Sequence, residues 1–286
     1  MLAAIAYLLV REPAVNAATR YPPTGPLIEV GGTTVHAHVE GTGPDVILIH
    51  GASGSTRDFT FDLVARLKDR YRVIAFDRPG LGHTGRLPVW AESPAEQAAL
   101  LDAAAAELGV GRAVIVGHSY GGAVALAWAL DRPDRAAAVV SLAGAAHPWE
   151  GELGLWYQVT STRLGGATVV PLVAALAPRS LAERAVAAIF APQPVPEGYL
   201  DHVGVDLTLR PETLRANARQ VNGLKPHLRA MAARYPGLAQ PVEILHGDAD
   251  TIVPLATHSE PLARLAPNAR LTVLPGVGHM PHHADP

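Results

Sequence analysis

Ser119 lies at the centre of Gly117-His118-Ser119-Tyr120-Gly121, which fits the pattern G-x-S-x-G. An apolar β-branched run precedes this pattern and an alanine-rich helical stretch follows it, so a strand is expected to meet a helix at a tight turn. Glycines two residues before and after the serine allow a turn that projects its side chain above a sheet. An N-cap serine is the alternative, but it would not need these glycines. We therefore interpret Ser119 as a nucleophile.

A serine hydroxyl needs a general base, and that base needs a carboxylate to orient it. Two later loops supply candidates, and each follows a predicted strand: GDADTIVP contains Asp248 and Asp250, and GVGHMP contains His279. Catalytic groups on open parallel sheets lie just past the carboxyl ends of the strands. The chain order of serine, aspartate and histidine also matches the order expected for such a sheet.

The elements that must position these residues alternate between strand and helix, which predicts a mostly parallel sheet with helices on both faces. We expect a β-hairpin over 27–40, helices over 57–70, 94–108 and 119–130, and strands over 45–50, 71–77, 113–117, 136–144, 241–247 and 269–276. The alternation fails over 148–240, where helical patterns cover 153–164, 180–190 and 210–235. This organisation predicts an N-terminal extension over 1–26, a core over 27–147 and 241–286, and a helical lid or cap over 148–240.

The motifs HGASGS, DRPGLGHTG, GHSYGG, GDADTIVP and GVGHMP together resemble those of the α/β-hydrolase fold family. The resemblance covers 27–147 and 241–286, and the insertion shows no specific match. It implies the α/β-hydrolase fold, with Asp250 rather than Asp248 as the acid and His279 as the base. Asp248 is then expected to cap its loop, and His282 and His283 to lie on the surface of the last loop.

The resemblance also implies an oxyanion hole made by the backbone N–H groups of Ala52 and Tyr120. The Tyr120 N–H lies in the first turn of a predicted helix, where it lacks an intrahelical partner and faces the positive end of the helix dipole. Two flanking histidines, His50 and His118, are interpreted as structural. Asp77 and Arg78 of DRPGLGHTG are expected to hold the neighbouring loop in place rather than to react.

A serine nucleophile argues against the related dehalogenases and epoxide hydrolases, which attack with aspartate at this position. We expect a serine carboxylesterase acting on small to medium apolar acyl esters, with a lipase, C–C bond hydrolase or perhydrolase as alternatives on the same residues. A non-catalytic ligand-binding protein is a remote alternative. The insertion would supply an apolar pocket or simply its own core, with Trp149, Trp156, Tyr157, Phe190 and Tyr199 as candidates.

The amino-acid composition limits which partners and cofactors can be expected. The 286 residues are 49% hydrophobic and 17% charged with a net charge of -3, so no nucleic-acid partner is expected. No cysteine is present, no cluster has metal-ligand spacing in the sequence, and neither a metal nor a cofactor is expected. The apolar start MLAAIAYLLV is an N-terminal surface helix, an anchor or a signal, and membrane association is expected only through it. The sequence ends at Pro286, seven residues after His279, so the usual final helix is expected to be either lacking or trimmed off, and the oligomeric state stays open.

Overall fold

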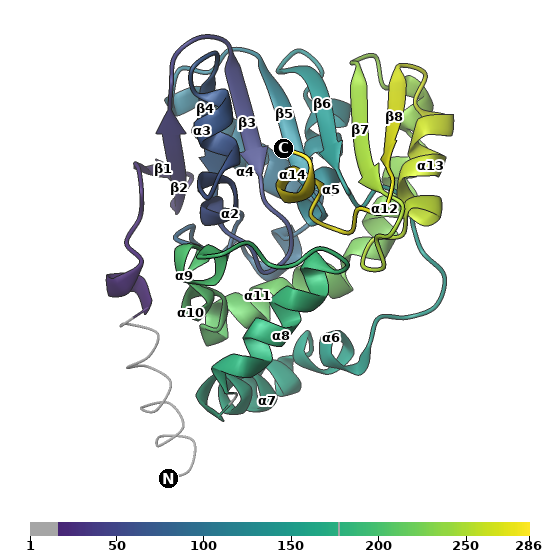
Figure 1. The fold of residues 1–286 in the computed structure, drawn as a ribbon. Helices are drawn as coiled ribbons and strands as arrows, with labels where there is room; N and C mark the ends of the chain where they lie inside the picture. Colours follow the sequence, from purple (N-terminus) through teal and green to yellow (C-terminus); the bar gives the residue numbers. More distant parts are fainter. Residues whose placement is uncertain (1–16, 177) are drawn as a thin grey trace.

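The computed structural model describes residues 17–176 and 178–286. The described residues form an eight-stranded sheet in the order β1-β2-β4-β3-β5-β6-β7-β8, in which β1, β2 and β4 pair antiparallel and the others parallel (Figure 1). The strands are β1 Leu27–Val30, β2 Thr33–Glu40, β3 Asp45–Ile49, β4 Arg72–Phe76, β5 Ala113–His118, β6 Ala136–Leu142, β7 Val242–Gly247 and β8 Ala269–Leu274. All of these strands were predicted, and so was the α/β-hydrolase fold.

Alternating side chains of the central strands build a core on each face of the sheet. On β3, Ile47 and Ile49 join the cluster with α4 (Pro94–Glu107) and α5 (Tyr120–Asp131), whereas Val46 and Leu48 join the cluster with Phe59. The second face is covered by α2 (Thr56–Thr60) and α3 (Leu63–Leu67), two short helices where one was predicted over 57–70. Because both faces are covered, β3 is apolar over Val46 to Ile49.

The segment between β6 and β7 is helical, as expected, and we call residues 148–240 the helical insertion. In Figure 1 it lies below the carboxyl ends of the strands. Its elements are α6 Leu155–Thr160, α7 Arg163–Leu176, α8 Arg179–Phe190, α9 Tyr199–Val203, α10 Val205–Thr208, α11 Pro211–Asn222, α12 Leu224–Ala232 and η2 Tyr235–Gly237. Most of α7 was not predicted, because Gly165, Gly166 and Pro171 are poor helix formers. The helix predicted over 210–235 breaks at Gly223.

The remaining elements are η1 Val89–Ala91, α13 Leu255–Leu265 and α14 Pro281–Ala284. Within the described residues, no single helix is long and apolar enough to cross a membrane. The helices α7 and α8 reach that length and hydropathy only when taken together, and they are bent by 101°. The apolar start of the chain, over 1–10, lies outside the described residues.

Candidate active site

Ser119 occupies the turn between β5 and α5 with a positive φ of 53°. The flanking glycines are required by space: a Cβ on Gly117 would overlap the carbonyl group of Gly121, and a Cβ on Gly121 would overlap the carbonyl oxygen of Ile49. The Ser119 side chain makes no capping hydrogen bond to α5. Its hydroxyl is therefore not used as an N-cap, which removes the structural alternative considered from the sequence.

His279 links the serine to a carboxylate contributed by another strand. Its Nε2 lies 2.9 Å from Ser119 Oγ, and its Nδ1 lies 2.7 Å from Asp250 Oδ2. A carboxylate accepts hydrogen bonds, so Nδ1 carries the proton and the lone pair of Nε2 faces the serine hydroxyl. The structure thus brings Ser119, Asp250 and His279 together in a geometry suited to proton removal from the serine.

Asp250 is held by other groups in addition to His279. The N–H groups of Ile252 and Val253 donate to Oδ1 at 2.8 and 2.9 Å, and His246 Nε2 lies 3.1 Å from Oδ2. Burial opposes ionisation of Asp250, but hydrogen bonds from His246 and His279 outweigh it and hold the pKa well below the usual range for aspartate. The carboxylate therefore stays charged at neutral pH.

The neighbouring acid has the structural role expected for it. The N–H of Gly276 donates to Asp248 Oδ1 at 2.6 Å, so Asp248 joins the loop after β7 to the loop after β8. Asp248 has an exposed side chain. His246, by contrast, was not predicted: its ring is fully buried in β7 and lies 2.6 Å from Ser259 Oγ.

The two positions predicted for the oxyanion hole lie beside the serine turn. Ala52 follows β3, and Tyr120 is the first residue of α5. Neither backbone N–H donates a hydrogen bond to another residue in the part of the chain that the structure describes. The helical insertion holds the Ala52 loop through the next residue, since Ser53 N donates to Asn217 Oδ1 and Thr208 Oγ1 donates to Ser53 O, both at 2.7 Å.

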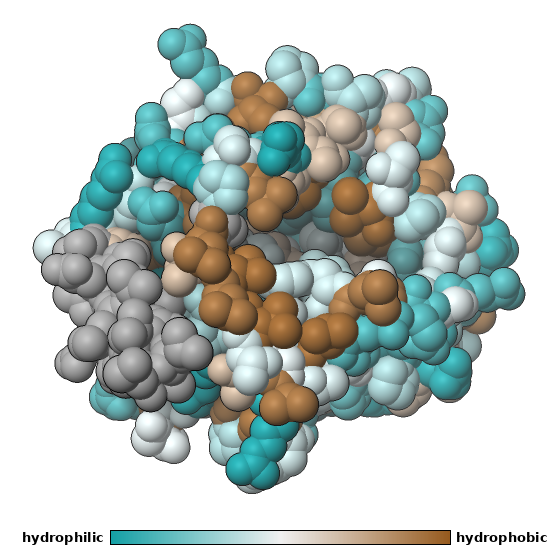
Figure 2. Space-filling model, turned by 90° about the horizontal axis from the view of Figure 1, so that it is seen from below, coloured by the Kyte–Doolittle hydropathy of each residue, from teal (hydrophilic) through white to brown (hydrophobic). Residues whose placement is uncertain are grey.

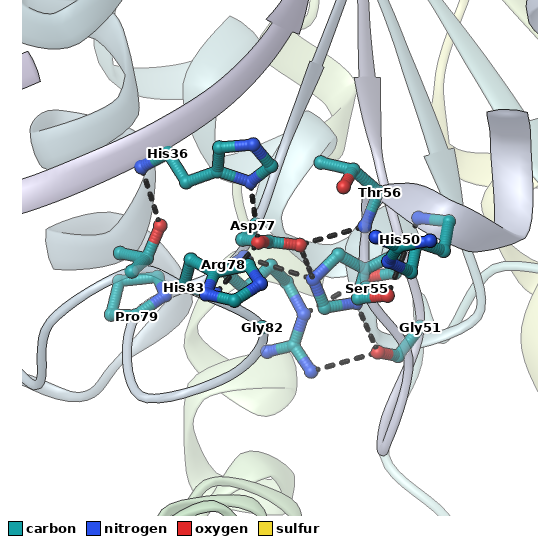
Figure 3. Close-up of polar contacts among 12 residues, drawn as sticks. His36, His50, Gly51, Ser55, Thr56, Asp77, Arg78, Pro79, Gly82 and His83 are labelled. Carbon is teal, nitrogen blue, oxygen red and sulfur yellow. Dashed lines mark hydrogen bonds and ion pairs between the residues drawn. The ribbon is translucent and has the colours of Figure 1, made fainter. Parts of the chain in front are cut away.

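Arg78 fixes the start of the same loop, as the sequence predicted. Its guanidinium donates to the carbonyl oxygens of His50 and Gly51 at 2.9 and 3.0 Å (Figure 3). Its backbone N–H donates to His50 Nε2 at 2.9 Å. Burial, together with the charge of Arg78, lowers the pKa of His50 to about 4, so the ring is neutral and can accept this bond. His50 therefore supports the loop, as predicted.

Asp77 organises the other side of this region (Figure 3). Its fully buried carboxylate accepts hydrogen bonds from Thr56 N at 2.7 Å and His83 N at 2.8 Å, and it lies 2.6 Å from His36 Nδ1. Burial opposes its ionisation, but the interactions with His36, His50 and the His83 backbone lower its pKa to about 2. Asp77 thereby joins α2, β2 and the loop after β4.

Replacing this carboxylate is expected to change stability in acid. The folded pKa of about 2 lies below the ordinary value of 3.8, so the charged form stabilises the fold above about pH 4, and this contribution is lost as the pH falls toward 2. The difference corresponds to about 2 kcal/mol. Urea unfolding of Asp77→Asn at a series of pH values should show lower stability at pH 7 and a shallower acid decline than the exposed control Asp69→Asn. Parallel acid declines in the two variants would contradict this assignment.

The sequence also matches a known protein family. Residues 44–286 match the family described as alpha/beta hydrolase fold. The chain belongs to this family. It is 31% identical over 247 residues to the magnesium-chelatase 30 kDa subunit of Rhodobacter capsulatus, covering 84% of this chain and 82% of that protein.

Similar solved structures of the alpha/beta hydrolase fold include esterases. A thermophilic esterase from Thermogutta terrifontis is 24% identical, with a TM-score of 0.70 and coverage of 89% of this chain and 90% of that one. An N-acyl homoserine lactone degrading enzyme is 22% identical, with a TM-score of 0.71 and coverage of 91% and 96%. These likenesses show a shared fold.

One prediction about this alpha/beta hydrolase was wrong: His282 and His283 are not surface residues. His282 Nε2 lies 3.1 Å from Asp58 Oδ2, His283 Nε2 lies 2.8 Å from Asp58 Oδ1, and both side chains are almost fully buried. Tyr199 Oη also donates to Asp58 Oδ1 at 2.7 Å. The rings are buried because α14 turns back against the sheet and brings them to the carboxylate on α2.

The buried cluster around Asp58 lies next to His279 of the candidate site. His118 Nε2 donates to the carbonyl oxygen of His279 at 2.9 Å, so His118 has the structural role predicted for it. Asp58, His118 and His282 also offer three potential metal ligand atoms within 4.8 Å of one another, a grouping that the sequence spacing did not predict. The hydrogen bond from His118 holds the chain at His279 itself, and those to Asp58 hold it three and four residues later.

The aromatic residues proposed as pocket candidates occupy different surroundings. Phe190 is buried against Tyr199 and Met280, the residue that follows His279. Trp149 packs against the larger core cluster, and Tyr157 is partly buried. Trp156 is 38% exposed and is the candidate that the structure places at the surface.

Proposed function

We propose that this alpha/beta hydrolase is a serine carboxylesterase that forms an acyl-enzyme on Ser119. The observation that carries the proposal is the 2.9 Å contact between His279 Nε2 and Ser119 Oγ at a strand-to-helix turn. Membership of the family and the esterases among similar structures support hydrolase chemistry.

In the proposed acylation step, Ser119 Oγ attacks the ester carbonyl carbon while its proton passes to His279 Nε2. Asp250 stabilises the resulting imidazolium through its contact with Nδ1. The carbonyl oxygen becomes an oxyanion, for which the N–H groups of Ala52 and Tyr120 are the proposed donors. His279 then protonates the alcohol as the bond between the carbonyl carbon and the alcohol oxygen breaks.

Deacylation uses the same groups in the reverse roles. A water molecule loses a proton to His279 Nε2 and attacks the acyl carbon, and the proton returns to Ser119 Oγ as the carboxylic acid leaves. The apolar composition of the helical insertion supports acyl groups without charge as substrates.

The test is a series of p-nitrophenyl esters from acetate to palmitate, with fluorophosphonate labelling of the same sample. We expect turnover and labelling, with the best acyl length of small to medium size. A folded sample that neither hydrolyses any ester nor reacts with the probe would overturn the proposal. Labelling without ester turnover would favour the alternative of C–C bond hydrolysis on the same residues.

A further inference from the structure

The outer side of the helical insertion concentrates exposed apolar side chains. Within the described residues, six of the thirteen large hydrophobic residues that are most exposed lie on α6 and α7. We call them the insertion face: Leu155, Trp156, Val159, Leu164, Leu172 and Leu176. Figure 2, which views the molecule from the side of the insertion, shows apolar side chains gathered around a hollow. Large apolar patches on soluble domains mark interaction sites.

The helical spacing explains why these residues share a surface. On α7, Leu172 and Leu176 follow Leu164 by eight and twelve residues, which places all three on one side of the helix. Leu164 and Leu176 are 75% and 73% exposed, whereas Gly165, Gly166 and Val170 of the same helix are buried. The helix therefore has one side packed on the domain and an apolar side without a partner among the described residues.

The hydropathy of this region suits the surface of a bilayer. Taken together, α7 and α8 have the length and hydropathy of a membrane span, but they bend by 101° and are fixed to the domain by buried residues. Such a pair cannot cross a bilayer as one rod and is suited to lying in its interface. Arg163 and Arg184 are exposed on these helices, where they can contact lipid phosphates. Arg179 is exposed as well, but it forms ion pairs with Glu183 and Asp201.

The position of the first described residues also supports a lipid bilayer as the partner of the insertion face. Ala17 and Tyr21 pack against Leu207 of α10, so the chain enters the described region at the helical insertion. The sixteen residues before Ala17 begin with the apolar run MLAAIAYLLV. An apolar N-terminal run joined to the insertion favours a lipid surface over a second protein as the partner.

The insertion face is also connected to the candidate site. On the inner side of α6, the partly buried Tyr157 lies next to Asn217 of α11, whose Oδ1 accepts from Ser53 N beside Ala52. The same short helix thus exposes Leu155 and contacts a residue that supports the proposed oxyanion loop. We propose that the insertion face docks on a lipid bilayer and that the substrates are esters that reside in that bilayer. The substrate part of this proposal rests on the proposed esterase function.

The binding test uses full-length protein and vesicles of phosphatidylcholine and phosphatidylglycerol, with Ser119→Ala so that hydrolysis does not alter the lipid. The triple variant Leu155→Glu, Leu164→Glu and Leu176→Glu should lower the vesicle partition coefficient by about 100-fold in co-sedimentation, because each glutamate replaces an apolar contact with lipid. The matched control is Leu27→Glu, Leu265→Glu and Val273→Glu, on β1, α13 and β8, and it should bind as Ser119→Ala alone does.

The substrate test compares the same triple variants with Ser119 intact. The triple variant on the insertion face should keep the hydrolysis of soluble p-nitrophenyl acetate and lose that of p-nitrophenyl decanoate held in vesicles, an ester of medium acyl length. Unchanged vesicle binding in the face variant would overturn the docking proposal, as would a change of oligomeric state without loss of binding. Loss of vesicle binding in the face variant, with no ester turned over by any protein, would support docking and overturn the proposed esterase function instead.

Discussion

The variant Ser119→Ala is expected to lose ester hydrolysis by about 10^6-fold in kcat and to lose fluorophosphonate labelling completely. The magnitude is that of a nucleophile removed from a site whose serine and histidine act as one unit. In this structure Ser119 Oγ has His279 Nε2 as its hydrogen-bond partner, so alanine removes one contact and keeps the Cβ. The measurements are steady-state kinetics and labelling followed by peptide mass spectrometry.

A second buried serine offers a matched control. Ser141 lies on β6 opposite Gly117 of β5, and its Oγ has no hydrogen-bond partner among the described residues. Ser141→Ala should therefore keep both activity and labelling. If Ser119→Ala is folded by circular dichroism and yet retains more than about a hundredth of the wild-type kcat, Ser119 is not the nucleophile.

The meeting of Ser119, Asp250 and His279 was predictable because each residue lies in a local sequence pattern that specifies its own turn. Ser119 and His279 are 160 residues apart, yet each follows a strand of the same parallel sheet. Once the strands are recognised in the sequence, the loops after them are predicted to lie together, because the carboxyl ends of parallel strands share one edge of the sheet.

The supporting shell was not predictable in the same way. Asp58 and His282 meet across 224 residues, and no pattern around either one specifies the other. Adjacent polar histidines near the end of a chain are usually exposed, and only the packing of α14 against the sheet buries them. The sequence did contain one indication of this contact. Asp58 directly precedes a core residue, Phe59, and a carboxylate that is buried with it needs hydrogen-bond donors.

The helical insertion exposes a further limit of sequence reasoning. Its helix α7 contains Gly165, Gly166 and Pro171, and tertiary contacts override their low helix propensity. Buried glycines let this helix approach its neighbours closely, since a Cβ on Gly165 would overlap the carbonyl group of Val159. Local propensity cannot report such a requirement.

The variant Asp250→Asn is expected to lower kcat by about 10^4-fold while leaving the fold intact. The structure explains why the amide must take the damaging orientation. Two backbone N–H groups, from Ile252 and Val253, donate to Oδ1, so the carbonyl oxygen of asparagine must occupy that position. Its NH2 group then lies at the Oδ2 position, 2.7 Å from His279 Nδ1.

An NH2 group at Oδ2 donates a hydrogen bond to His279 Nδ1, which must then give up its own proton. The proton moves to Nε2, where it faces Ser119 Oγ and leaves no lone pair to accept the hydroxyl proton. Asp248→Asn, in the same loop, is the matched control and should change kcat by less than about threefold, because the Asp248 carboxylate accepts a hydrogen bond from Gly276 N, which the oxygen of an asparagine amide can also accept. Equal kcat values for the two variants would show that the Asp250 carboxylate does not set the tautomer of His279.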